Sequence, residues 1–241
     1  MPDAIDNQRE WEDPSLASWY GTFDHLFAPE RTILETLGPR LAEMSMLDIG
    51  VGAGRTSLHF AGLVRRYDAI DYSTAMIAEC RRRLPDVGSF HVADARDLSL
   101  FADATFDFVL FSFNGIDNLG FDDRDRALRE ISRVLRGGGV FAFSTHNLEF
   151  LERIWPPSRG VVGKWLDNRR RRRLLPAGRG VLTHHVRGAT LPQAYIRHDL
   201  QRDALVALGA RDIRLLSTWD GSFIAEDRLV SEPWLNYLCD F

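Results

Sequence analysis

Apolar and polar positions follow two alternating rhythms between residues 46 and 147. Short, mainly apolar runs predict strands: SMLDIG, YDAIDYS, SFHVAD, FDFVLFSFN and VFAFSTHN. The runs FDFVLFSFN and VFAFSTHN are continuous enough for burial on both faces. Between the strands, GRTSLHFAGL, TAMIAECRRRL and DDRDRALREISRVL predict helices, the last with RGGG as its C-terminal stop. This alternation predicts an α/β fold with a doubly wound, mainly parallel sheet and helices on both faces.

The flanking segments follow other patterns. SLASWYGTFDHLF predicts an amphipathic helix with Leu16, Tyr20, Phe23 and Phe27 on one stripe, and ERTILETL predicts a second helix. After residue 147 the alternation breaks, and residues 151–190 contain WPPSRG, RRRRR and HHVRG, which indicate an insertion or cap. LQRDALVALGA then predicts a helix and RDIRLLSTWD a strand, before a short tail that contains SEPWLNYLCDF.

We therefore expect four segments along the chain. They are N-terminal helices that cover the ligand site (1–45), a ligand-binding core (46–147), a substrate cap inserted after the fifth strand (148–195), and the end of the core sheet with a C-terminal tail (196–241).

Composition limits the class of protein. A chain of 241 residues with 45% hydrophobic residues suits one domain with an elaboration. A net charge of -4 and a pI near 6.0 give no general attraction to nucleic acid or acidic membranes. Cys80 and Cys239 form no CxxC pair, so no metal site or disulfide framework is expected. The N-terminus MPDAIDNQREWEDPS does not resemble a signal peptide, and no apolar run approaches the roughly 20 residues that span a bilayer. These features predict a cytoplasmic protein without a membrane segment.

A glycine-rich loop, GVGAG, leaves the first predicted strand at the sheet edge where ligands of such folds bind. Asp71 ends the second strand, 21 positions after Gly50, where its carboxylate can accept both ribose hydroxyls. Asp94 ends the third strand and can accept from an adenine amino group, while the Ala95 N–H can meet a ring nitrogen. Each carboxylate could instead cap a helix or turn, and the loop alone could be a tight turn.

The spacing of the glycines separates two classes of cofactor. Dinucleotide folds carry G-x-G-x-x-G with pyrophosphate at a helix N-terminus, whereas this chain has D-x-G-x-G-x-G beginning at Asp48. An acidic residue there disfavours a phosphate and favours a cation such as the ammonium group of an amino acid. Adenine, ribose and an amino acid without a phosphate describe S-adenosylmethionine.

Five segments in order strengthen this interpretation: MLDIGVGAGRTS, AIDYSTAMI, FHVADARDL, FDFVLFSFNGIDNL and LREISRVLRGGGVFAFSTHN. Over roughly residues 30–147 the chain resembles the class I S-adenosylmethionine-dependent methyltransferases of small-molecule type. The resemblance implies a Rossmann-like sheet of seven strands with the last antiparallel, and S-adenosylmethionine converted to S-adenosylhomocysteine. It also implies that Arg31 or Arg55 could pair with the cofactor's carboxylate, although each could be a solvated charge.

The cofactor-binding residues expected from the motifs and the resemblance are Tyr20, Arg31, Asp48, Gly50, Gly52, Gly54, Asp71, Tyr72, Met76, Asp94, Ala95, Arg96, Phe111, Ser112 and Phe113. The residues expected to bind the methyl acceptor are Asn114, Asn118, Asn147, Trp155 and Trp165.

Methyl transfer from a sulfonium is an in-line displacement, so most of the catalysis can come from alignment. A hydroxyl or ammonium nucleophile also needs a base, for which the candidates are His146, His184, His185 and Asp117. His146 follows the fifth strand and is best placed, although it could be a structural histidine. The segment FSFNGID lacks the Pro-Pro-aromatic pattern of nucleic-acid amino methyltransferases and contains no cysteine nucleophile.

The predicted function is O- or N-methylation of a small organic metabolite, within secondary metabolism by resemblance. The run Arg169–Arg173 could be a solvated basic face or could grip an anionic group of the substrate. The alternatives are a methyltransferase that docks RNA or protein through Arg169–Arg173, and a non-catalytic S-adenosylmethionine-binding protein. Nucleic acid is disfavoured as a partner, and the interpretation allows a homodimer.

Overall fold

The computed structural model describes residues 5–153 and 177–241. The helices outside the sheet are α1 (Gln8–Trp11), α2 (Pro14–Tyr20), α3 (Ala28–Leu41), α4 (Ser57–Phe60), α5 (Thr74–Arg83), α6 (Phe121–Val134), α7 (Leu148–Arg153) and α9 (His198–Ala207), with short helical turns η1 (Gly115–Asn118) and η2 (Glu226–Ser231). The strands are β1 (Ser45–Ile49), β2 (Arg66–Asp71), β3 (Ser89–Val92), β4 (Phe106–Phe111), β5 (Leu135–Asn147), β6 (Arg179–Val186), β7 (Ala189–Ile196), β8 (Asp212–Leu216), β9 (Phe223–Ile224) and β10 (Trp234–Asp240).

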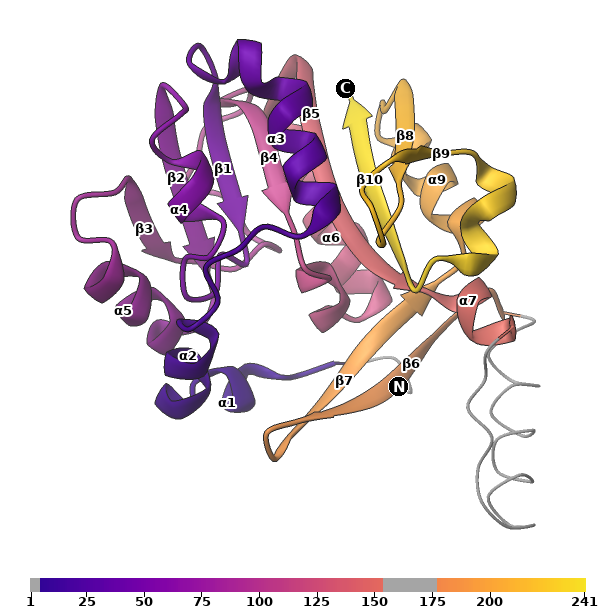
Figure 1. The fold of residues 1–241 in the computed structure, drawn as a ribbon, viewed down its shortest axis with the longest axis horizontal. Helices are drawn as coiled ribbons and strands as arrows, with labels where there is room; N and C mark the ends of the chain where they lie inside the picture. Colours follow the sequence, from indigo (N-terminus) through magenta and orange to yellow (C-terminus); the bar gives the residue numbers. More distant parts are fainter. Residues whose placement is uncertain (1–4, 154–176) are drawn as a thin grey trace.

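The described strands form one mixed sheet in the order β3-β2-β1-β4-β5-β10-β8-β9 (Figure 1). The strands from β3 to β5 are parallel, and β10 is antiparallel to both β5 and β8. This confirms the Rossmann-like, mainly parallel sheet with an antiparallel last strand. The hairpin β6–β7 and the short β9 add to the seven expected strands. The division of the chain into four functional segments stays a prediction.

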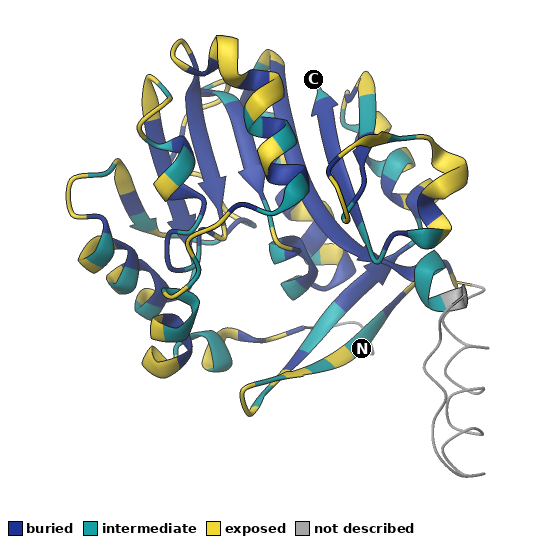
Figure 2. Cartoon of the chain, viewed as in Figure 1, coloured by how far each residue is buried: buried dark blue, intermediate teal, exposed yellow. Residues whose placement is uncertain are grey.

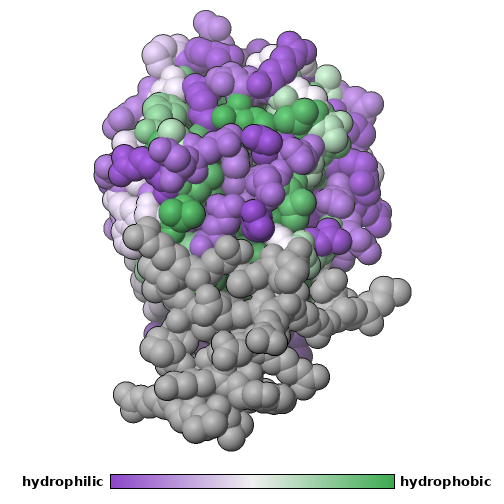
Figure 3. Space-filling view, turned by 90° about the vertical axis from the view of Figure 1, so that its right-hand side faces the viewer, coloured by the Kyte–Doolittle hydropathy of each residue, from purple (hydrophilic) through white to green (hydrophobic). Residues whose placement is uncertain are grey.

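Two apolar layers cover the two faces of the sheet, because neighbouring residues of a strand point to opposite sides. Phe141 and Phe143 pack with the inner face of α6 and with α9, whereas Val140 and Ala142 pack with α3, α4 and α5. The strands are accordingly buried and the outer helix faces exposed (Figure 2). On the side that carries α9 and η2, apolar side chains are interspersed among polar ones (Figure 3). The homodimer that the sequence allowed stays a prediction.

Three predictions about individual elements are wrong. The helix expected to run to Phe27 ends at Tyr20, where Gly21, a poor helix former, is the C-cap. The RGGG segment does not stop α6, which already ends at Val134. It begins β5, beside a register shift against β4. The segment expected as a tail is β10, an inner strand between β5 and β8.

Among the described residues, no helix is long and apolar enough to cross a membrane.

Candidate active site

A cavity of about 510 Å³ lies where the parallel strands end. It is lined by residues at or after the carboxyl ends of β1, β2, β3, β4 and β5, and by residues of α1, α2, β6 and β7. Figure 1 shows α1, α2 and the hairpin β6–β7 on this same side of the sheet. The cavity therefore joins the strand ends that carry the predicted cofactor motifs to segments from both ends of the chain.

The glycine loop forms one wall of the cavity. Gly50 and Gly52 have φ angles of +62° and +56°, a left-handed conformation that side chains oppose. A Cβ at Gly50 would lie 2.9 Å from the Phe111 ring, whereas a Cβ at Gly52 would meet no atom within 4 Å. The backbone at Gly52 thus borders open space that a ligand can approach closely. Gly54 packs beside Cys80 and Leu84 and does not line the cavity.

Two carboxylates line the wall beyond the loop. Asp71 accepts hydrogen bonds of 2.9 Å from the N–H groups of Gly52 and Ser73, and burial raises its pKa to about 6. Burial also acts to raise the pKa of Asp94, but hydrogen bonds from the Arg96 side chain and backbone lower it overall. Asp71 is therefore held partly dehydrated at the cavity wall, while Asp94 stays ionised beside a cation.

Asp48, expected beside the methionine portion of the cofactor, does not line the cavity. Its carboxylate is buried and accepts hydrogen bonds from Thr56 Oγ1 at 2.5 Å and from the Tyr67 hydroxyl at 2.8 Å. Arg31 is exposed and donates to the Leu26 carbonyl. Neither side chain reaches the space where a ligand fits, so direct contacts from them are not supported.

Arg55 lines the cavity, so the alternative that it is a solvated charge is wrong. Its side chain is 12% exposed and forms a paired contact with Glu30, at 2.5 and 2.6 Å. The guanidinium lies 4.8 Å from the centre of the Phe27 ring and 5.5 Å from that of Phe113. Phe113 and the next residue, Asn114, both have positive φ angles, a conformation that costs energy and concentrates at functional sites.

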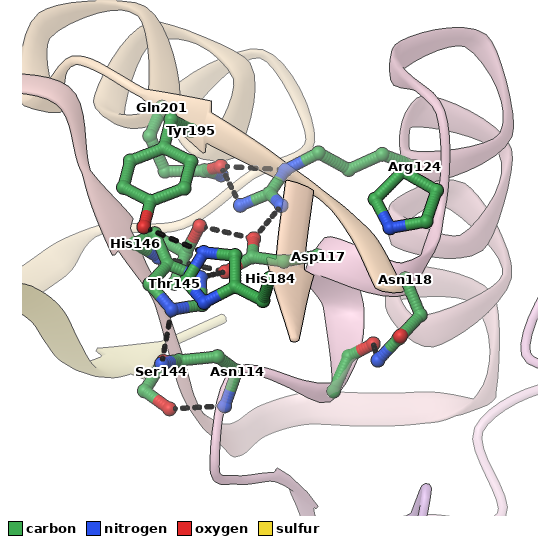
Figure 4. A network of polar contacts seen from close by, with 12 residues as sticks. Asn114, Asp117, Asn118, Arg124, Ser144, Thr145, His146, His184, Tyr195 and Gln201 are labelled. Carbon is green, nitrogen blue, oxygen red and sulfur yellow. Dashed lines mark hydrogen bonds and ion pairs between the residues drawn. The ribbon is translucent and has the colours of Figure 1, made fainter. Parts of the chain in front are cut away.

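His146 and Asp117 form a buried pair at the other end of the cavity (Figure 4). Asp117 Oδ2 lies 2.7 Å from both the backbone N and the ring Nδ1 of His146, while Oδ1 accepts from Thr145 and Arg124. Since Asp117 takes the Nδ1 hydrogen, Nε2 is left as an acceptor on the cavity side. Asp117 itself does not line the cavity, so it orients His146 rather than meeting a ligand.

The other predicted polar residues divide between the cavity and its surroundings. His184 lines the cavity and pairs with the Tyr195 hydroxyl at 2.8 Å, and burial lowers its pKa. His185 lies on the exposed face of the hairpin. Asn147 is fully buried and donates to the carbonyls of Leu229 and Glu232. Trp155, Trp165 and Arg169–Arg173 lie outside the described residues.

The cavity brings together most of the predicted site: Tyr20, Gly50, Gly52, Asp71, Tyr72, Met76, Asp94, Ala95, Arg96, Phe111, Ser112, Phe113, Asn114, Asn118, His146 and His184. It does not include Arg31, Asp48, Gly54, Asp117, Asn147 or His185.

Sequence reasoning missed several lining residues, among them Asn7, Trp11, Phe27, Gln193 and Trp234. Trp234 follows no cofactor motif and reaches the cavity because β10 pairs with the end of β5. Trp11 offered only a weak signal, as an aromatic residue in a polar N-terminal segment. In the described part of the chain, no group of three His, Cys, Asp or Glu side chains could hold a metal ion.

Residues 47–143 match the family model described as "Methyltransferase domain". This segment contains the glycine loop, Asp71 and Asp94, which line the cavity just described. This domain belongs to the class I S-adenosylmethionine-dependent methyltransferases. S-adenosylmethionine is the cofactor of this family and S-adenosylhomocysteine is its product.

Curated relatives and solved structures agree with the domain. Demethylmenaquinone methyltransferase from Beutenbergia cavernae is 36% identical over 137 residues, which cover 57% of this methyltransferase chain and 53% of the relative. Malonyl-[acyl-carrier protein] O-methyltransferase from Methylococcus capsulatus is 31% identical over 179 residues, which cover 67% and 61%. The DhpI–SAH complex aligns with a TM-score of 0.62 at 18% identity, over 98% of this chain and 96% of that one, and so supports the fold. The methyltransferase spans about half the length of the curated relatives it matches.

Proposed function

We propose that this methyltransferase transfers a methyl group from S-adenosylmethionine to an oxygen or nitrogen atom of a small organic metabolite. The observation that carries the proposal is one continuous cavity that is lined by Gly50, Asp71 and Asp94 and also by His146. When bound, S-adenosylmethionine supplies a methyl group on a positively charged sulfur, and the bond to sulfur breaks as the acceptor's lone pair bonds to the methyl carbon.

The lining residues fit this cofactor. The open space beside Gly52 admits a ligand against the backbone, and Asp71 offers a carboxylate for two ribose hydroxyls. Asp94 accepts a hydrogen bond from the adenine amino group, and the Ala95 N–H donates to a ring nitrogen of adenine. Arg55 lines the same cavity, but its guanidinium is paired with Glu30 and so leaves a contact with the cofactor's carboxylate unassigned. We assign cofactor binding to the glycine loop, Asp71, Asp94 and Ala95 rather than to Asp48 and Arg31.

His146 removes the proton of the attacking hydroxyl or amine. Its Nε2 is the acceptor, with a long contact of 3.4 Å to Asn114 Nδ2, since Asp117 holds Nδ1–H. The paired carboxylate stabilises the imidazolium that forms. Trp11, Phe27 and Trp234 line the cavity and exclude water from the reacting groups. The curated relatives carry names with different acceptors, demethylmenaquinone and a malonyl group on acyl-carrier protein, so the acceptor of this chain is part of the proposal.

Substitution His146→Ala tests the role of the base. We expect kcat to fall by about 100- to 10,000-fold, the usual contribution of a positioned base, while S-adenosylhomocysteine binds as before. Turnover is measured as S-adenosylhomocysteine released with a library of phenols, alcohols and amines, and binding by calorimetry. The matched control is His185→Ala, on the exposed face of the hairpin.

Equal turnover in His146→Ala and the wild type would remove His146 as the base and leave alignment as the mechanism. Binding of S-adenosylmethionine without any turnover across the library would favour a non-catalytic binding protein. Turnover on RNA or protein that salt suppresses would favour docking through Arg169–Arg173. The place in secondary metabolism stays a prediction.

A further inference from the structure

Around His146 the cavity wall is rich in polar side chains that are not cations. They include His146 and His184 together with four amides, from Asn7, Asn114, Asn118 and Gln193, while the Asp6 carboxylate lines the cavity next to Asn7. The amides Asn7 and Asn118 bond to each other at 2.8 Å, and Trp11 Nε1 donates to the same Asn118 oxygen at 3.1 Å. These contacts form a hydrogen-bonding wall of amide and indole side chains.

The cations on the described cavity wall are already neutralised. Arg55 is paired with both carboxylate oxygens of Glu30, and Arg96 with Asp94 and Asp123. No other Arg or Lys among the described residues lines the cavity. A methyl acceptor with a carboxylate or phosphate would therefore find no unpaired cation here, and burial of an unpaired charge is costly.

Asn114 presents a buried acceptor that has no partner. The residue is 3% exposed and lines the cavity, yet its Oδ1 makes no hydrogen bond. Its backbone N–H is bonded to Ser144 Oγ at 2.8 Å, and its φ angle of 57° fixes a conformation that asparagine tolerates well. Its Nδ2 lies 3.4 Å from His146 Nε2 (Figure 4), a long contact that leaves Nε2 available to a stronger donor.

Two acceptors thus belong to adjoining side chains at this wall: Nε2 of His146 and Oδ1 of Asn114. Buried polar atoms are almost always hydrogen-bonded in native proteins, so an unpartnered oxygen on a cavity wall points to a donor on the ligand. The surrounding aromatic side chains, Trp11, Phe113 and Trp234, suit a planar apolar body behind that donor.

We propose that the methyl acceptor is an aromatic molecule with a head group that has no negative charge and carries two hydrogen-bond donors, and that Asn114 determines this specificity. A neutral primary amine or two adjacent hydroxyl groups has this chemistry. One donor meets His146 Nε2 and the second meets Asn114 Oδ1, which leaves a lone pair of the accepting atom free. The inference rests on the proposed function, because it takes His146 as the end of the cavity where the acceptor sits.

The test is calorimetry on the full chain saturated with S-adenosylhomocysteine, with matched aromatic probes at neutral pH. Aniline and catechol carry two donors, N-methylaniline and phenol carry one, and benzoate is an anion. We expect aniline to bind about tenfold more tightly than N-methylaniline, and catechol about tenfold more tightly than phenol, the worth of one hydrogen bond near the top of its usual range. Benzoate should bind most weakly. Binding of benzoate as tight as that of aniline, or no preference within either pair, overturns the inference.

The variant Asn114→Gly tests whether Asn114 causes the preference for two donors, because glycine accepts the positive φ angle and the variant lacks the side-chain amide. We expect it to bind S-adenosylhomocysteine as the wild type does but to lose the preference for two donors. A retained preference removes Asn114 as its cause. The control variant His185→Ala should keep the preference for probes with two donors. Should S-adenosylhomocysteine fail to bind, the proposed function fails, and the same probes titrated alone still test the head-group preference.

Discussion

At the scale of single residues, Asp71 makes cofactor binding depend on pH. Burial raises its pKa to about 6, so in the free protein it is ionised at neutral pH and protonated as the pH falls through that value. A protonated carboxyl accepts ribose hydroxyls poorly. We therefore expect the affinity for S-adenosylhomocysteine to be constant above pH 6 and to weaken below it, by at most about tenfold per pH unit. Calorimetric titrations across this range measure the effect.

The variant Asp71→Asn assigns this dependence to one group. Asp94 stays ionised in the same range, because hydrogen bonds from Arg96 outweigh the effect of burial and lower its pKa. Asp48, whose pKa burial also raises to about 6, does not line the cavity. Asp71→Asn should bind more weakly and lose the pH dependence. A dependence that survives the substitution would mean that another group controls binding.

The residue scale also shows what a sequence can predict about a site. Asp71 and Asp94 lie at the ends of predicted strands, and the carboxyl ends of parallel strands meet at one edge of the sheet. Their positions in the sequence therefore predicted that both side chains line one cavity, as they do. The same reasoning took Asp48 as a cofactor contact. On a strand, the side to which a side chain points depends on each single position, and Asp48 instead meets Thr56 and Tyr67 behind the loop.

At the scale of elements, the two glycines of the loop serve the fold and the ligand differently. Substitution of either by alanine costs about 1–2 kcal/mol for the left-handed backbone. Gly50→Ala adds a contact of 2.9 Å with Phe111 in the free protein, whereas Gly52→Ala meets nothing within 4 Å. We expect Gly50→Ala to lower the melting temperature more, and Gly52→Ala to weaken S-adenosylhomocysteine binding more than tenfold with little further loss of stability. Thermal melts and calorimetry on both variants compare the two effects, and normal binding by Gly52→Ala would argue against a ligand beside this loop.

Element prediction succeeded where a local pattern decides the structure and failed where packing does. The five parallel strands were predicted from short, mainly apolar runs, and all of them form. The segment SEPWLNYLCDF has similar apolar character, but its role depends on pairing with β5, some 90 residues earlier in the chain. The hairpin β6–β7 joins the end of β5 in the same way, with Tyr195 beside His146. No periodicity within either segment specifies such a partner.

At the scale of the whole molecule, the base depends on segments that are distant in the sequence. Asp117 follows β4, Arg124 lies on α6, and Gln201 on α9 accepts from the Arg124 guanidinium at 2.6 Å. Arg124 is 1% exposed and Asp117 is fully buried, so each charge requires the other. Asp117 was predicted to be catalytic itself, because nothing local in the sequence indicates the arginine that neutralises it or the histidine that it orients.

Because the cavity draws on the N-terminal helices, the sheet and the hairpin β6–β7, ligand binding should stabilise the molecule as a whole. A ligand that binds only the folded state at 100 times its Kd adds about 2.7 kcal/mol. For a chain of 241 residues this corresponds to a rise in melting temperature of roughly 5–10 °C. We expect that rise with S-adenosylhomocysteine in a thermal melt, and a smaller one at the same ligand concentration in Asp71→Asn. NAD should give no rise, because the glycine spacing lacks the G-x-G-x-x-G phosphate-binding pattern of dinucleotide folds. An equal rise with NAD would show that the cavity does not distinguish an amino acid from a pyrophosphate. The glycine loop would then be interpreted as a nucleotide-binding loop without selectivity for S-adenosylmethionine.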